Sequence, residues 1–120
     1  MSIASARSIK TAQTKMRILE LELDSSPATP AVSGFDAFQI KSIVDVGVGE
    51  ITLIMLRPFN LDNADKAKAF IQPLEADLTG YVKAVDYDRV TIQLTDLDGV
   101  AKDGAVSLLI IGSDAKHRQG

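Results

Sequence analysis

The chain has 120 residues, of which 46% are hydrophobic and only 5% aromatic, and it contains neither Trp nor Cys. This size predicts one domain with an aliphatic core, and the lack of Cys excludes disulfides, thiolate metal sites and cysteine nucleophiles. The net charge of −3 is uneven, because residues 1–17 carry +4, residues 18–115 carry −9 and residues 116–120 carry +2. An acidic body argues against a dedicated nucleic-acid-binding domain.

Residues 1–16 are rich in Ser, Ala, Thr and Lys, and we expect them to form an arm that precedes the folded body. The basic side chains at the start of the chain are Arg7, Lys10, Lys15 and Arg17, with no acid among them. A basic arm on an acidic body is typical of a segment that contacts an acidic surface. That surface is nucleic acid, a partner protein or a neighbouring copy; the alternative is a solvated tail. These four residues are the candidate partner contacts.

Residues 17–24 alternate Leu with Glu, which predicts a strand buried on one face. Residues 25–30 hold two prolines and three hydroxyl side chains, and therefore form a loop. Residues 38–46 alternate again and predict a second strand. Its apolar face would consist of Phe38, Ile40, Val44 and Val46.

Gly47 and Gly49 predict a chain reversal. The apolar residues 50–57 that follow favour a buried strand, which Pro58 ends because proline cannot donate a ladder hydrogen bond.

Residues 64–72 are ambiguous. Alternation of Ala67, Ala69 and Ile71 favours a strand, whereas the Ala and Lys content suits a short helix capped by Asn63. We favour the strand, because the neighbouring segments are strands.

Two strands, 81–85 and 89–95, flank a compact turn and predict a hairpin. Residues 96–99 read as a further turn. Residues 105–111 are almost all apolar, which predicts a central strand buried on both faces.

About seven strands at this spacing predict a mainly β fold, a single antiparallel β-sandwich or barrel with an extended N-terminal arm. The domain organisation is then an arm at 1–16, a β domain at 17–114 and a tail at 115–120. No apolar stretch is long enough to span a membrane, and the first ten residues lack the apolar block of a signal peptide.

Several residues carry chemistry in isolation but do not assemble a site. Asp96, Asp98 and Asp103 begin like a calcium loop, yet Ser occupies the position where such a loop needs its bidentate Glu. The Gly-x-Gly at 47–49 lacks the third glycine and the helix of a dinucleotide site. His117 lies in the predicted tail, where nothing orients it. Turn chemistry accounts for these residues.

Two further groups of side chains carry potential chemistry. Asp86 and Asp88 could pair as catalytic carboxylates, but they flank a tight turn. The aromatic residues Phe59, Phe70, Tyr81 and Tyr87 could stack on sugars or bases, with only Lys83 and Arg89 as nearby bases. Packing is the default for these aromatics. With no nucleophile–base pair or metal cluster, we expect a protein without enzymatic activity, cofactor or metal.

Three features combine into a resemblance. They are the Gly47-Val48-Gly49 turn before a strand ending in Pro58-Phe59, the Val90-Thr91-Ile92 strand with its Asp96-Leu97-Asp98-Gly99 turn, and the closing run Val106–Asp114. Over roughly residues 34–114 the chain resembles small structural proteins of tailed bacteriophages, of the head-decoration, head-fibre or tail-fibre type. It departs from their pattern at Glu50-Ile51, where an aromatic often follows the glycine pair.

This resemblance implies a virion protein, assembled in the host cytoplasm, that decorates or stabilises a capsid through contacts with the major capsid protein or another virion protein. It also implies a homo-oligomer, with a trimer favoured, whose neighbouring copies cover the sheet edges. No direct role with nucleic acid or membrane is expected. The alternative hypothesis is a fibre module that recognises a host-surface glycan or receptor through exposed aromatic residues.

Overall fold

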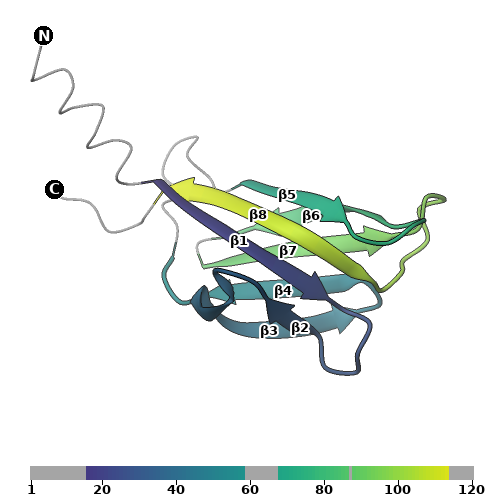
Figure 1. Ribbon diagram of the computed structural model, residues 1–120, viewed down its shortest axis with the longest axis horizontal. Helices are drawn as coiled ribbons and strands as arrows, with labels where there is room; N and C mark the ends of the chain where they lie inside the picture. The colour runs from purple at the N-terminus through teal and green to yellow at the C-terminus, as the bar shows by residue number, and fades with distance from the viewer. Residues whose placement is uncertain (1–15, 59–67, 87, 114–120) are drawn as a thin grey trace, which may run out of the picture.

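The computed structural model describes residues 16–58, 68–86 and 88–113. Its eight strands form two antiparallel four-stranded sheets that pack together without closing into a barrel (Figure 1). The prediction of a mainly β, sandwich-like body is confirmed, and the barrel alternative is wrong. The described part of the chain contains no helix with the length and hydropathy needed to cross a lipid bilayer.

The first sheet, called sheet A here, has the strand order β2-β1-β8-β5. Its strands are β1 (Met16–Asp24), β2 (Ala31–Ser33), β5 (Lys68–Pro73) and β8 (Ala105–Ser113). The whole of β1 pairs with β8, so the first and last described strands are neighbours at the centre of the sheet (Figure 1).

The second sheet, sheet B, has the order β3-β4-β7-β6. Its strands are β3 (Ile40–Gly47), β4 (Glu50–Met55), β6 (Thr79–Val85) and β7 (Arg89–Thr95). A single 3-10 turn, η1 (Ala37–Gln39), leads from β2 into β3. The hairpin predicted around residues 86–88 is confirmed, because β6 and β7 pair antiparallel.

The core lies between the sheets and is aliphatic, as the composition predicts. Alternate residues of the four central strands point inward, since side chains of a strand alternate between its two faces. The buried set is Leu19, Leu21, Leu23, Ile51, Leu53, Met55, Leu78, Val90, Ile92, Leu94, Val106, Leu108 and Ile110. The alternations predicted for residues 17–24 and 89–95 are therefore confirmed.

The apolar face predicted for residues 38–46 is wrong. Ile40 and Ile43 pack on the core, whereas Val44 and Val46 are exposed and Phe38 belongs to η1. The reason is a register shift between Ile40 and Ser42, which adds a residue to β3 and moves the later side chains to the opposite face.

The structure has one strand more than the seven predicted. The extra strand is β2, whose three residues are too few to show a period of two. Within the ambiguous segment, residues 68–72 belong to β5, and Ala69 and Ile71 pack on the core as the strand interpretation requires. Ala67 and the residues before it lie outside the described residues.

Candidate interaction surface

The outer face of sheet A carries apolar side chains where a solvated sheet face would carry polar ones. Ile18 of β1 is 57% exposed, Phe70 of β5 is 55% exposed and Leu109 of β8 is 37% exposed. Residues directly opposite in a ladder share a face, and Leu109 lies between Glu20 and Phe70. In the adjacent row Ile18 lies opposite the half-buried Ile111. These side chains therefore form a continuous apolar surface across three strands.

This apolar surface follows from the sequence of β8. Its residues 106–111 are Val-Ser-Leu-Leu-Ile-Ile, which predicts burial on both faces. The structure confirms that β8 is central and that its inner side chains are buried. Its outer face, however, is covered by no described residue well enough to bury Leu109. The burial predicted for that face is thus incomplete within residues 16–58, 68–86 and 88–113.

An acidic row runs beside the apolar surface. Glu20, Glu22 and Asp24 occupy alternate positions of β1, opposite the outward-facing Leu109, Ser107 and Ala105. Lys68 is the one basic residue among the outward positions of the described strands of sheet A. The outer face therefore combines apolar and negatively charged groups.

Phe35 extends this face beyond the end of β2. It is 83% exposed and lines a shallow hollow together with Glu20, Glu22 and Ser107. Its position is held by Asp36, whose amide donates to the Glu20 carbonyl at 3.0 Å and whose Oδ2 accepts from the Glu20 amide at 2.8 Å. We call the outward set Ile18, Phe35, Phe70, Leu109 and Ile111, with Glu20, Glu22 and Asp24, the sheet A surface.

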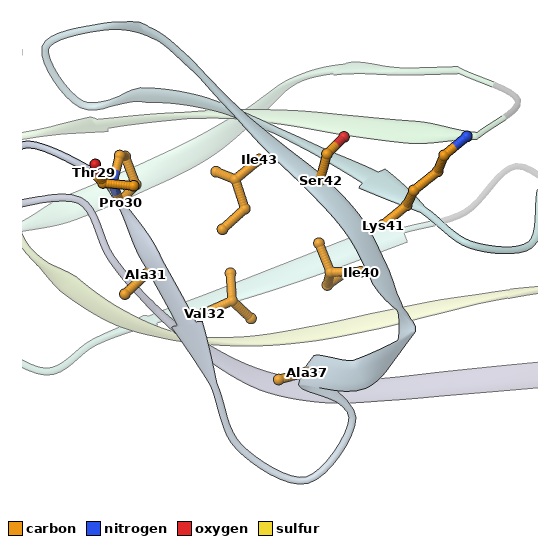
Figure 2. A pocket seen from close by; sticks show the side chains of 9 residues that line it. All are labelled: Thr29, Pro30, Ala31, Val32, Ala37, Ile40, Lys41, Ser42 and Ile43. Carbon is orange, nitrogen blue, oxygen red and sulfur yellow. The ribbon is translucent and has the colours of Figure 1, made fainter.

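A second feature is the groove where the edge strands β2 and β3 part. Figure 2 shows Val32, Ile40 and Ile43 in the space between the two strands, with Lys41 and Ser42 nearer its rim. The groove has a volume of about 430 Å³. Its lining contains no carboxylate or imidazole, so it suits an apolar side chain and offers no acid–base pair.

Of the four predicted contact residues, the structure describes Arg17 alone. Arg7, Lys10 and Lys15 lie outside the described residues. Arg17 differs from the expectation, because it belongs to β1, is only 7% exposed and donates from a guanidinium nitrogen to the Arg57 carbonyl at 2.7 Å. It faces inward since it shares the register of Leu19 and Leu21.

The aspartates singled out in the sequence bond backbone amides. Asp96 Oδ1 accepts from the amides of Asp98 and Val100, both at 2.9 Å, and Asp103 Oδ1 accepts from the Gly49 amide at 2.7 Å. These bonds are the turn chemistry that the sequence suggests. Among the described residues no group of three or more His, Asp or Glu is placed to hold a metal ion.

Asp88, one of the two aspartates considered as paired carboxylates, is bonded to Arg89. Arg89 donates from Nε to Asp88 Oδ1 at 2.9 Å, and this hydrogen bond lowers the pKa of Asp88 below its ordinary value. The same contact raises the pKa of Arg89. A carboxylate held in its charged form is a poor proton donor at neutral pH, so Asp88 acts as the acidic partner of Arg89 in a surface ion pair.

The described aromatic residues do not assemble a stacking platform. Phe70 faces outward from sheet A, opposite Leu109, while Tyr81 faces outward from sheet B, opposite Gln93. Phe59 and Tyr87 lie outside the described residues, as does His117. The nearby bases Lys83 and Arg89 form ion pairs with Glu50 and Asp88.

Sequence reasoning missed the sheet A surface as a site, although its signals were in the sequence: the two-sided apolar pattern of β8 and the Leu–Glu alternation of β1. Only the pairing of β1 with β8 brings them onto one face. Comparison of the chain with protein-family models, curated proteins and solved structures gives no match.

Proposed function

We propose that this chain is a non-enzymatic structural subunit of a phage-like particle, which decorates or stabilises a capsid through protein–protein contacts. The observation that carries the proposal is the sheet A surface, where the central strand of a sheet presents Leu109 outward with exposed Ile18 and Phe70 beside it. Contiguous apolar patches on a folded domain are typical of protein interfaces.

The energetics favour a protein partner. Burying an aliphatic or aromatic side chain contributes about 1.5–3 kcal/mol when it passes from full exposure to full burial. Ile18 and Phe70 are a little over half exposed, so each retains about 1 kcal/mol of this gain for a partner that covers them. The acidic row of β1 lies directly beside the apolar side chains of β8 and β5, so a partner can combine apolar contacts with polar ones.

The resemblance of residues 34–114 to phage structural proteins supports a place in the virion. On this proposal the partners are the major capsid protein or another virion protein, together with further copies of this chain in a ring, for which a trimer is favoured. Assembly takes place in the host cytoplasm.

The test places a charge at the centre of the sheet A surface. Virus-sized particles would be purified on a density gradient from a culture of the source, stripped of this protein and incubated with tagged full-length chain. We expect wild type to sediment with the particles and Leu109→Lys to remain unbound, because a lysine there must be desolvated. Leu97→Lys is the matched control, since Leu97 is 70% exposed in the turn after β7.

Leu109→Thr separates loss of binding from loss of folding, because Thr keeps the strand propensity of the site while removing apolar surface. It should fold and bind weakly. Absence of the protein from native particles would overturn the virion assignment, and equal binding of wild type and a folded Leu109→Lys variant would overturn the role of this surface.

A further inference from the structure

We infer that the sheet A surface receives residues 1–15 of a second copy of this chain, with the basic side chains of that arm against the acidic row of β1. The inference rests on the proposed function in using the same surface, and it names the segment that covers it.

Charge complementarity is the first support. The outward positions of β1 are Glu20, Glu22 and Asp24, about 7 Å apart along the strand because alternate residues share a face. Within the described residues neither Glu20 nor Glu22 forms an ion pair, and Asp24 accepts only from the Ser26 amide. Residues 1–15 supply Arg7, Lys10 and Lys15 and contain no acid. Opposite charges therefore face each other in matched number.

The apolar content of the two segments also matches. On the surface, Leu109 lies directly beside Glu20, and Ile18 follows in the next row. In the arm, Ile9 lies between Arg7 and Lys10, and further apolar residues precede it. A purely basic arm would leave the apolar surface uncovered, whereas this arm offers both kinds of group.

The direction of the chain favours a second copy over the chain's own arm. To lie on its own β1, the arm would have to reverse just before Met16, where β1 begins. Tight reversals rely on Gly, Pro, Asn, Asp or Ser, and residues 9–23, which lead up to and into β1, contain none of these. The start of β1 is also fixed, because Arg17 is bonded to the Arg57 carbonyl. The surface of a neighbouring copy requires no such turn.

The arm is long enough. Fifteen residues reach about 50 Å when extended, and the nine residues of β1 span about 30 Å. An arm from a neighbour can therefore cross the gap between copies and still follow the acidic row.

The experiment exchanges charges between the two segments of the full chain. The arm variant is Arg7→Glu with Lys10→Glu, and the surface variant is Glu20→Lys with Glu22→Lys. Association is followed by light-scattering mass and sedimentation velocity at low and high salt. We expect wild type to associate, and each variant alone to associate about tenfold more weakly at low salt, with a smaller difference at high salt because exposed charges are screened.

Mixing the two variants is the decisive step. A mixture pairs basic arms with acidic surfaces and acidic arms with basic surfaces, so it should associate more tightly than either variant alone. Pairs and rings with an even number of copies should recover fully, whereas a ring of three keeps one mismatched contact. The control is Asp45→Lys with Asp98→Lys, which makes the same charge change at exposed positions on β3 and in the turn after β7; it should associate like wild type.

Three outcomes overturn the inference. They are a wild-type chain that stays monomeric at high micromolar concentration, association that ignores both charge reversals, and a mixture that fails to recover. The proposed function is tested separately, by comparing particle binding of wild type and Leu109→Lys. Failure of the arm contact is therefore distinguishable from failure of the proposed function.

Discussion

Gly49 is the residue whose identity the structure constrains most clearly. Its φ is +68°, and a Cβ built there would lie 2.4 Å from the Leu94 carbonyl oxygen and 2.6 Å from that of Lys102. This close approach allows two hydrogen bonds that stabilise the fold. The Gly49 carbonyl accepts from the Leu94 amide, and the Gly49 amide donates to Asp103 Oδ1. One glycine thus fastens the β3–β4 turn to the segment after β7.

We predict that Gly49→Ala lowers the free energy of unfolding by about 2 kcal/mol or more, since a left-handed conformation alone costs a non-glycine residue about 1–2 kcal/mol and the backbone contacts add to this. Gly47→Ala is the matched control, because no atom lies within 4 Å of a Cβ there and its φ is not positive. Urea unfolding measures both. Equal stability of the two variants would contradict the conclusion that position 49 requires glycine.

At the scale of elements, the Asp36 side chain continues the hydrogen bonding of β2 to β1 beyond the end of β2. The strand has only three residues, and where it ends the Asp36 carboxylate accepts from the Glu20 amide as a further strand would. This contact holds Phe35 beside the acidic row of the sheet A surface.

Asp36→Ala should therefore increase hydrogen exchange at the Glu20 amide and lower stability by about 1 kcal/mol, the usual contribution of one hydrogen bond. Asp36→Asn retains an acceptor oxygen and should restore most of the protection. Amide exchange followed by NMR distinguishes the two, and identical exchange at Glu20 in wild type and Asp36→Ala would show that the bond does not form in solution.

The edge strands of sheet B, β3 and β6, are poor sites for pairing with another copy. β3 has two register shifts. Its exposed Asp45 pairs with the buried Ile51 and therefore occupies an inward-facing position. β6 has a register shift at Val82/Ala84. Irregularities and inward charges at an edge oppose strand addition. The face of sheet A is for this reason a better candidate for assembly than the edges of sheet B.

For the whole molecule, β8 is the strand on which the fold depends. It pairs with β1 on one side and β5 on the other and supplies Val106, Leu108 and Ile110 to the core. Its partner β1 is the first described strand, so the central pair of sheet A can form only after residues 16–113 have been synthesised.

A chain that ends at residue 104 should lose cooperative unfolding, because β1 and β5 no longer share a neighbour and the core loses three buried side chains. A chain that ends at residue 113 retains every described strand and should unfold cooperatively like the full chain. Thermal unfolding followed by circular dichroism tests this. A sharp transition in the shorter chain would show that the remaining strands form a fold without β8.

The strand content, the position of most turns and the inward residues of β1 and β7 were predictable, because the period-two alternation of apolar side chains and the backbone freedom of glycine act locally. The alternation failed in β3, where a register shift depends on its pairing with β4. It could not reveal β2, which exists through its pairing with β1.

By itself, the sequence determined a β-rich chain with an aliphatic core, an acidic body and a basic arm, since these are sums over residues. Only the tertiary structure decided that β1 and β8 are neighbours, that Arg17 is buried and that an acidic row lies beside exposed Leu109. The physical reason is that register and sheet order are set by contacts between segments distant in sequence, and a surface for a partner arises where such segments meet.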